Sequence, residues 1–330
     1  MNNFIIKMMS MLIPSRKKRQ MFRDKYKMSP IQEALSLARH LRARRDWEDS
    51  FCISRHFAPS PGRPKELLTG SPPSQEVLSR FQYLMEEPRL DYFLSLDTAP
   101  IPATADREGY YGEQHFAYWL LGLSDYLRLC AAFELKPGMK ILDWGGATGR
   151  VARHFAAYHP NVNVTVADIN RNHIDYINNI FDFPNLRGVK VSSLPFLPFE
   201  DNSLDLIYAF SVFTHIDEYE TGWLAELSRI LKPGGLAYLT IQSDKTWENL
   251  ENTFVYNCIK DNEAFPKDWK PGASMLQDRM LFTIAEGCDY ANHIFLHTKH
   301  INKVWCKFFD IKDIVYAGHS YQDVVLLGKK

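Results

Sequence analysis

The stretch "ILDWGGATGR", residues 141–150, combines three kinds of local structure. Four residues typical of a buried strand carry the carboxylate Asp143, a turn rich in glycine follows, and a helix begins after it. Glycine permits backbone conformations with positive φ and lets a ligand approach the main chain, while a helix N-terminus presents free N–H groups. The stretch therefore predicts a ligand-binding turn between a strand and a helix.

Three classes of ligand bind such turns, and the residues distinguish between them. A phosphate-binding P-loop requires Lys-Ser or Lys-Thr after the glycines, and neither pair follows here. A dinucleotide fingerprint registered on Gly145 places Ala147 and Arg150 at its other glycine positions, and Asp143 would repel a pyrophosphate. A carboxylate at this place suits a cation, and S-adenosylmethionine carries both an ammonium and a sulfonium.

Apolar runs of strand length alternate with helical patterns from Lys140 onward, which is typical of a doubly wound α/β fold with a parallel sheet. The expected strands are residues 140–144, 163–168, 188–192, 204–210, 235–241, 311–318 and 322–328. The expected helices between them are residues 149–158, 171–181 and 218–231, the last ended by the sequence KPGG. Residues 243–297 interrupt the alternation after the fifth strand, and we expect this insertion to cover the substrate at the carboxyl edge of the sheet.

The pattern before residue 107 is different. An amphipathic helix is expected at residues 30–46, a Pro- and Gly-rich linker at 58–74, and further helices at 75–86 and 115–133. The sequence thus predicts two parts, a helical N-terminal extension over residues 1–106 and a catalytic domain over residues 107–330.

At four motifs the chain resembles the class I S-adenosylmethionine-dependent methyltransferases, over roughly residues 140–330. "ILDWGGATGR" resembles their first motif, D-x-G-x-G-x-G, with Ala147 in place of the central glycine. "VTVADIN", "LPFEDNSLDLIYAFSVFTHI" and "LSRILKPGGLAYLTI" resemble the later motifs, in the same order. The resemblance implies a Rossmann-like sheet of seven strands with a reversed last strand, S-adenosyl-L-methionine as cofactor, and methyltransferase activity.

The resemblance also implies how the cofactor is held. Asp168 would accept hydrogen bonds from both ribose hydroxyls, and Ile169 would pack on the adenine. Ser193 occupies the place where these enzymes often carry an acidic residue for the adenine amino group. Tyr111 would close the pocket at the methionine end. The residues expected to bind the cofactor are Tyr111, Asp143, Gly145, Gly146, Ala147, Thr148, Gly149, Asp168, Ile169, Ser193, Leu194, Phe210 and Ser211.

The acceptor is expected to be a small molecule, because the chain is similar to bacterial methyltransferases of sugar, surface-glycan and natural-product pathways. A hydroxyl acceptor requires a base, and His215 follows the fourth strand at the carboxyl edge of the sheet. A purely structural role for His215, in which it fixes the loop through hydrogen bonds, is the competing interpretation, and Glu113 and His115 are other candidate bases. A nitrogen acceptor, an RNA or other macromolecular substrate, and an inactive cofactor-binding scaffold also stay open.

A metal site is not expected, because the spacing of His293, His297 and His300 matches no helical metal motif. Five scattered cysteines without a C-x-x-C pair favour a reducing cytoplasm over a disulfide framework.

The charge of the chain is uneven although its net charge is zero. Residues 1–45 carry twelve Lys or Arg against Asp24 and Glu33, so this basic arm is near +10 and the remainder near −10. The arm is expected either to be a solvated helical face or to contact an anionic surface such as membrane headgroups. Few aromatic residues accompany its charges, which disfavours nucleic acid as a partner. The apolar residues at the N-terminus are too few to form a transmembrane segment.

Overall fold

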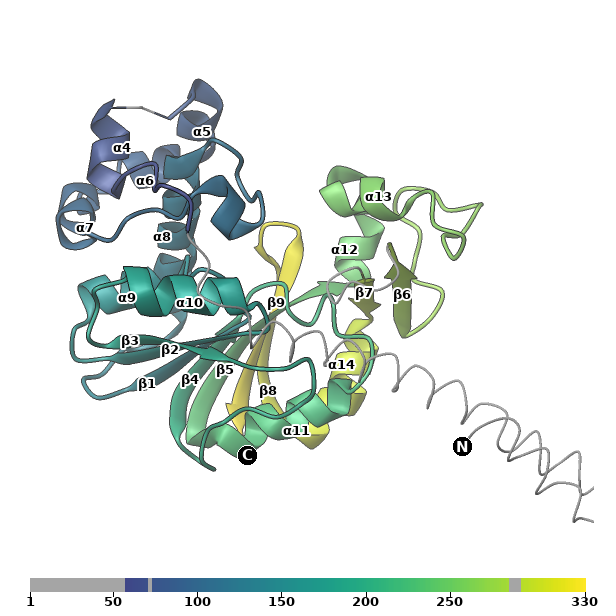
Figure 1. The fold of residues 1–330 in the computed structure, drawn as a ribbon. Helices are drawn as coiled ribbons and strands as arrows, with labels where there is room; N and C mark the ends of the chain where they lie inside the picture. Colours follow the sequence, from purple (N-terminus) through teal and green to yellow (C-terminus); the bar gives the residue numbers. More distant parts are fainter. Residues whose placement is uncertain (1–56, 71–72, 285–291) are drawn as a thin grey trace, which may run out of the picture. The chain divides into compact units, whose positions relative to one another are not determined.

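The computed structural model describes residues 57–70, 73–284 and 292–330, all within a compact unit spanning Ile53–Lys330 (Figure 1). The basic arm, residues 1–45, and the helix expected at residues 30–46 lie outside the described residues. None of the described helices is long and apolar enough to cross a membrane.

The central sheet has the order β3-β2-β1-β4-β5, continued by β9 and β8 (Figure 1). Its strands are β1 (Lys140–Trp144), β2 (Asn163–Asp168), β3 (Leu186–Lys190), β4 (Leu204–Ala209), β5 (Leu231–Ser243), β8 (Phe309–His319) and β9 (Gln322–Lys329). The first five strands are parallel, and β9 runs antiparallel to both β5 and β8. This arrangement confirms the predicted α/β sheet with a reversed last strand.

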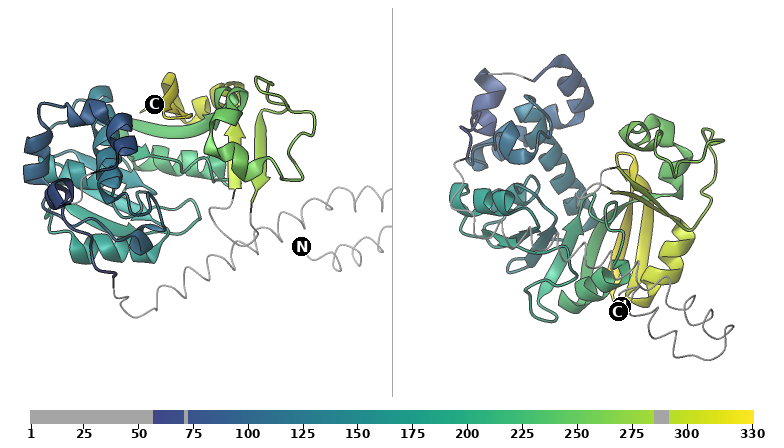
Figure 2. Two further views of the ribbon diagram at one scale, coloured as in Figure 1. Left: turned by 90° about the horizontal axis from the view of Figure 1, so that it is seen from above. Right: turned by 45° about the vertical axis from the view of Figure 1, so that its right-hand side comes forward.

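The insertion adds two strands to the seven that were expected. In it, β7 (Asn292–Leu296) pairs in parallel with the end of β5, and β6 (Arg279–Thr283) pairs antiparallel with β7. The short helices α12 (Asp244–Glu248), η2 (Leu250–Asn252) and α13 (Phe254–Ile259) come before them. Trp247, Phe282 and Phe295 form the centre of a separate apolar core, so the insertion is a packed subdomain (Figure 2).

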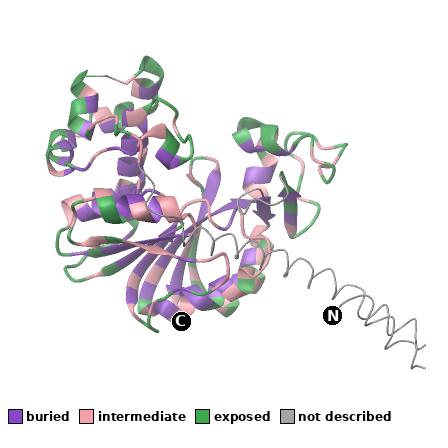
Figure 3. Cartoon of the chain, in the orientation of Figure 1, coloured by how far each residue is buried: buried purple, intermediate pink, exposed green. Residues whose placement is uncertain are grey.

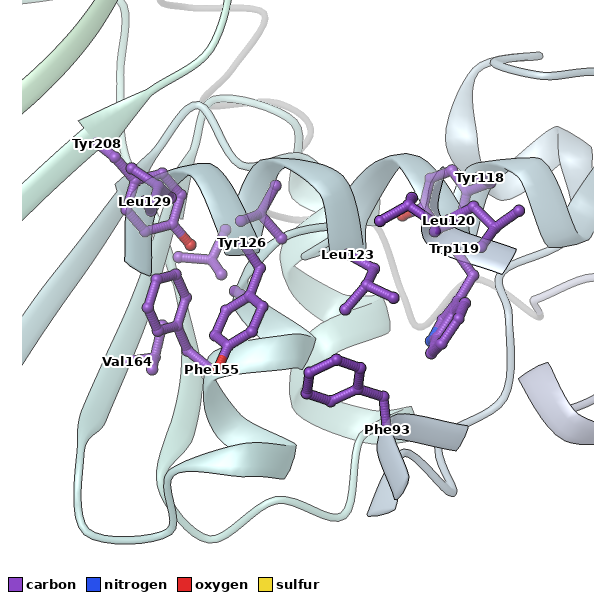
Figure 4. Close-up of a cluster of buried hydrophobic side chains, with 14 of the residues drawn as sticks. Phe93, Tyr118, Trp119, Leu120, Leu123, Tyr126, Leu129, Phe155, Val164 and Tyr208 are labelled. Atoms are coloured by element: carbon purple, nitrogen blue, oxygen red, sulfur yellow. The ribbon is translucent and has the colours of Figure 1, made fainter. Parts of the chain in front are cut away.

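Helices cover both faces of the sheet, and the strands between them are buried (Figure 3). One apolar cluster joins the sheet to α8 (His115–Ala132), α9 (Ala152–Tyr158) and α10 (Arg171–Ile180). Figure 4 shows its centre, where Tyr126 and Leu129 of α8 meet Phe155, Val164 and Tyr208. A second cluster joins the other face to α11 (Glu220–Ile230), α14 (Thr298–Val304) and η3 (Trp305–Lys307).

The segment before α8 shares the first of these cores. It contains α4 (Pro64–Gly70), α5 (Gln75–Arg80), α6 (Gln82–Met85), α7 (Leu90–Leu96) and η1 (Thr104–Arg107). Arg153 of α9 makes two hydrogen bonds of 2.7 and 2.9 Å to Asp97, which also accepts a 2.7 Å bond from the Trp119 indole. The division at residue 106 stays a sequence prediction, and residues on both sides of it contribute to this buried ion pair.

Several elements differ from the expected ones. Residues 58–74 were expected to be a linker, but α4 forms a helix within them, because only the residues before Pro64 and after Gly70 carry the turn-forming pattern. The helix expected at residues 75–86 is divided at Phe81, and α9 begins at Ala152 because the glycine turn takes up the residues before it. The KPGG sequence lies inside β5 rather than before it. Leu204 pairs with Leu231 but Leu206 pairs with Leu236, so the intervening residues bulge out of the ladder, and Gly234 supplies the required positive φ of 77°.

Candidate cofactor and acceptor site

The turn after β1 has the backbone conformation that its glycines predict. The φ angles of Gly145 and Gly149 are 72° and 74°, and that of Ala147 is 46°. The Ala147 N–H donates a 2.9 Å hydrogen bond to Asp168 Oδ2, which holds the alanine in this left-handed conformation. Ala147 replaces the glycine of the family motif, but its backbone still adopts the left-handed conformation that glycine favours.

Two of the glycines are required by close packing. A Cβ atom on Gly146 would lie 2.4 Å from the carboxyl carbon of Asp143, and one on Gly145 would lie 2.5 Å from Val212 Cγ2. Neither distance leaves room for a side chain. The turn is consequently held between the carboxyl group of Asp143 and the residues that follow β4.

The carboxyl group of Asp143 is buried and incompletely paired. It is 2% exposed, and its Oδ2 has no hydrogen-bond partner among the described residues. Burial raises the pKa of Asp143 to about 7, against the opposing effects of the Tyr208 hydroxyl and the Arg150 guanidinium. A cationic ligand at the adjacent turn would favour the ionised carboxylate. The residues at this position thus fit the methionine end of S-adenosylmethionine, which carries two positive groups.

Asp168 ends β2 at the same edge of the sheet. One carboxylate oxygen accepts from Ala147 N–H at 2.9 Å and the other from Asn170 N–H at 2.7 Å. Each oxygen keeps a further lone pair, so the group can still accept from two ribose hydroxyls. Ile169 is half-buried against the apolar cluster that contains α11. The next loop places Ser193 and Leu194, both half-buried, with the Leu194 N–H donating to Ser192 Oγ at 3.3 Å.

The first turns of α8 contact the glycine turn, and the segment before α8 contacts the end of β2. Thr148 and Tyr118 share a 2.7 Å hydroxyl–hydroxyl hydrogen bond, and the ring of Tyr111, whose φ is 64°, lies 6.3 Å from that of Tyr118. Glu108 accepts a 2.5 Å bond from the Asn170 side chain, beside Asp168. Tyr111 is thus brought to the glycine turn.

Arg107 organises this segment, and sequence reasoning missed it. Its guanidinium donates to the backbone oxygens of Pro102, Tyr110 and Gly112 at 3.0, 2.7 and 2.5 Å. It is 1% exposed. A buried arginine that binds three carbonyl groups fixes the path of a loop. The available sequence signal was its place in a stretch that contains Asp106, Gly109 and Gly112, residues that favour turns.

A second missed group ties α8 to the turn. Asp125, fully buried in α8, lies 2.7 Å from an Arg150 guanidinium nitrogen and 3.1 Å from His319 Nε2. Burial alone would raise the pKa of Asp125, but Arg150 and His319 hold this pKa below its usual value. Arg150 directly follows the last glycine of the turn, so this ion pair connects the turn to α8 and to the end of β8.

Phe210 and Ser211 lie where β4 ends. Ser211 has φ of 60°, and its N–H donates to Thr240 Oγ1 of β5 at 2.7 Å. Its hydroxyl accepts a 2.9 Å hydrogen bond from Gln322 Nε2 of β9. A non-glycine residue in this conformation is strained and needs such partners, and strain of this kind is concentrated at functional sites.

His215 lies in the turn that follows. Its Nδ1 is 2.7 Å from the backbone oxygen of Asn292, which can only accept, so Nδ1 carries the proton and Nε2 carries the lone pair. Burial lowers the pKa of His215, which keeps the ring neutral near pH 7. The His215 N–H also binds the carbonyl of Val212, the residue packed against Gly145. The structure thus connects His215 to the glycine turn through Val212.

The other two candidate bases lie at the start of α8. His115 Nδ1 is 2.8 Å from an Arg107 nitrogen and its Nε2 is 3.2 Å from a Glu113 oxygen. Burial, followed by the charge of Arg107, lowers the pKa of His115. The Glu113 side chain is 85% exposed. His115 and Glu113 are thus brought together with each other and with Arg107, while the contacts of His215 are with β7.

His293 of β7 lies beside His215, and sequence reasoning did not assign it to the site. Its ring lies 5.7 Å from that of His215. The other two histidines of this stretch lie elsewhere, because His297 accepts from Lys299 N–H at the start of α14 and His300 binds Glu220 at 2.9 Å. Within the described part of the chain no group of three or more His, Cys, Asp or Glu could hold a metal ion.

Comparisons with known proteins agree with this geometry. Residues 141–235 match a family model described as a methyltransferase domain. The ubiquinone/menaquinone biosynthesis C-methyltransferase UbiE of Cupriavidus pinatubonensis is 33% identical over 133 residues, which are 38% of this chain and 53% of that protein. The sterol 24-C-methyltransferase erg6 of Schizosaccharomyces pombe is 33% identical over 33% of this chain and 30% of that protein. The chain thus spans about half or less of the length of these curated relatives.

A solved structure of a SAM-dependent methyltransferase from Aquifex aeolicus aligns with 64% of this chain and 92% of that chain, with 17% identity and a TM-score of 0.41. The matched region, residues 141–235, contains the glycine turn, Asp168 and the turn with His215. The chain therefore carries a class I S-adenosylmethionine-dependent methyltransferase domain, and its cofactor is S-adenosyl-L-methionine.

Proposed function

We propose that the protein transfers the methyl group of S-adenosylmethionine to a hydroxyl of a small-molecule acceptor, such as a sugar, a glycan precursor or a natural product. The observation that carries the proposal is the orientation of His215, whose Nδ1 is held by the Asn292 carbonyl so that Nε2 is free to accept a proton. The printed names of the curated relatives, which concern ubiquinone, menaquinone and sterols, support a small molecule as the acceptor class.

The residues have separate roles in this proposal. The turn at Gly145 with Asp143 would hold the methionine end of the cofactor, and Asp168 would hold its ribose. When bound, S-adenosylmethionine supplies an electrophilic methyl group on a sulfonium. His215 Nε2 takes the hydroxyl proton while the acceptor oxygen bonds to the methyl carbon, and the methyl–sulfur bond breaks with its electron pair left on sulfur. The protein's main task is to align the acceptor and exclude water.

Cofactor binding is tested at Asp168. Replacing it by alanine removes the acceptor for the ribose hydroxyls and the anchor of Ala147 N–H, so Asp168→Ala should weaken S-adenosylmethionine binding by about 1–3 kcal/mol, or roughly 5- to 150-fold. Isothermal titration calorimetry measures the change. Asp201→Ala, which removes an exposed carboxylate paired with Arg229, is the matched control and should bind as the wild type does. Equal binding by the Asp168→Ala variant would contradict the assignment.

The base is tested at His215 with an acceptor found by product analysis of a hydroxylated panel. His215→Ala should lower kcat by about 10²- to 10⁴-fold and leave cofactor affinity unchanged. The lowered pKa of His215 means that the wild-type rate should rise with pH and level off below the usual histidine range, because only the neutral ring accepts a proton. The variant should lack this step. A variant that keeps the step would exclude His215 as the base, and a product methylated on carbon would exclude the hydroxyl acceptor.

A further inference from the structure

Two neutral histidines lie side by side at the carboxyl edge of the sheet and come from different parts of the chain. His215 follows β4, and His293 belongs to β7 in the insertion. Their ring centroids are 5.7 Å apart and their planes are inclined by 49°. Two hydrogen bonds of about 2.8–3.0 Å each span a separation of the same size, so the spacing of the two rings is compatible with one oxygen atom bound between them.

The two rings carry their protons on different nitrogens. His215 Nδ1 donates to the Asn292 carbonyl, which leaves Nε2 as an acceptor. His293 Nδ1 lies 3.4 Å from Gln242 Nε2, which can only donate, so Nδ1 is the acceptor and the proton is on Nε2. Neither Nε2 atom has a hydrogen-bond partner in the described part of the chain. The two neighbouring rings therefore carry one free acceptor and one free donor.

The surroundings keep both rings uncharged. His293 is 6% exposed, and burial together with the nearby His215 lowers its pKa to about 4. Burial also lowers the pKa of His215, opposed by its bond to Asn292. Among the described residues, no carboxylate, lysine or arginine contributes to either shift. Gln242, which binds His293, is 1% exposed and has a buried Oε1 without a partner among the described residues.

An aromatic side chain lies at the outer side of this pair. Phe254 of α13 is 59% exposed, although its ring makes edge contacts with His293 at 6.2 Å and with Tyr321 at 5.5 Å. Burial, together with the nearby Cys258, Tyr110 and Tyr111, raises the pKa of Tyr321 to about 12. Phe254 therefore offers an accessible apolar face beside the buried ring of His293.

We infer that His293 is an acceptor-binding residue that donates its Nε2–H to the same oxygen from which His215 takes the proton, with Gln242 fixing the tautomer of His293. A hydroxyl is the group that fits, because it donates one hydrogen bond and accepts another. An ammonium cannot accept from His293, and a carboxylate cannot donate to His215. This inference rests on the proposed function and adds the means by which the site selects a hydroxyl attached to an apolar ring.

The first test requires no substrate. In protein labelled with ¹⁵N at histidine, nuclear magnetic resonance at pH 7 should show His215 protonated at Nδ1 and His293 protonated at Nε2. Gln242→Glu places a carboxylate acceptor against Nδ1 of His293, so it should move the His293 proton to Nδ1 and leave His215 unchanged. A wild-type His293 that carries its proton on Nδ1 would overturn the inference, even if cofactor binding and methyl transfer are intact.

The second test uses phenol, aniline and toluene as probes of one shape, in the presence of S-adenosylhomocysteine so that no turnover occurs. Phenol should shift the Nε2 signals of both histidines, and toluene should shift neither. His293→Leu should weaken phenol binding about tenfold, whereas His293→Gln, which keeps an N–H donor, should bind within about threefold of the wild type. His297→Asn is the control at a half-buried histidine of the same stretch that contacts neither ring, and it should leave phenol binding unchanged.

Unchanged affinity for S-adenosylhomocysteine shows that each variant is folded. Equal phenol binding by His293→Leu and the wild type would overturn the role of His293. Failure of the wild-type protein to bind S-adenosylhomocysteine would instead contradict the proposed function. The experiment therefore distinguishes a wrong role for His293 from a wrong function.

Discussion

Asp143 combines deep burial with an ionisable carboxyl group, and this combination should make cofactor binding depend on pH. Its pKa of about 7 means that the free protein carries a partly protonated carboxyl at neutral pH. A cation at the turn favours the ionised form, so bound cofactor should lower this pKa and binding should release protons. S-adenosylmethionine affinity is therefore expected to rise between pH 5.5 and 7.5. Calorimetric titrations in two different buffers measure how many protons are taken up or released when the cofactor binds, and so test this dependence.

Asp143→Asn should remove that pH dependence and weaken the cofactor at pH 7.5. The pH dependence of the stability of the ligand-free protein has the opposite sign to that of its cofactor affinity. Because the folded pKa is raised from 3.8, the stability contributed by Asp143 is complete below about pH 4 and is lost as the pH rises to about 7. Without cofactor, the Asp143→Asn variant should accordingly have a higher Tm than the wild type at pH 8. The difference in Tm should be smaller at pH 4. A wild-type affinity that is constant across this range would refute the role of Asp143.

At the scale of an element, the turn after β1 makes opposite predictions for two neighbouring residues. Gly146→Ala places a methyl group 2.4 Å from the Asp143 carboxyl carbon, so the turn must move, and cofactor affinity should fall at least tenfold. Ala147→Gly removes a side chain from a residue with φ of 46° and should leave affinity within about twofold, because glycine adopts this conformation without strain. Calorimetry on both variants separates the two effects, and equal losses would contradict the close packing described for Gly146.

Several elements could be predicted closely from the sequence. The strands at 140–144 and 163–168 and the start of α8 at His115 agree with the structure because an apolar pattern and a turn signal coincide there. β3 was displaced by two residues, since its strand is half-buried and its apolar pattern is weak. The glycine turn and Asp168 were recognisable because the cofactor binding proposed for them needs particular residue types at a fixed spacing.

Other parts of the site depend on pairing between distant segments. His293 stands 78 residues after His215, and the pairing of β7 with β5, together with the contact of Asn292 with His215, brings the two histidines together. A local pattern has no information on that register. Arg107 and Asp125 were missed for a similar reason, because their partners are backbone carbonyls of a folded loop and an arginine from another element.

For the whole molecule, we expect cofactor binding and binding to an anionic surface to depend on different parts of the chain. Residues from Ile53 onward form one compact unit that contains the residues proposed to bind the cofactor and the acceptor. The arm of residues 1–45 carries a net charge near +10. The remainder is near −10, so an anionic surface should repel it. We expect that only the arm provides affinity for acidic lipid.

Deletion of residues 1–52 should therefore abolish binding to phosphatidylglycerol vesicles at low salt and leave S-adenosylmethionine affinity unchanged. Binding of the full chain should weaken steeply with added salt, because the Debye length falls to about 10 Å at 0.1 M. Replacing Arg16, Lys17, Lys18 and Arg19 by Gln keeps the length of the arm and should reduce vesicle binding without affecting the cofactor. Vesicle sedimentation measures both variants. If the full chain fails to bind acidic vesicles at low salt, the arm serves no surface of this kind, and its charge only solvates the N-terminal segment.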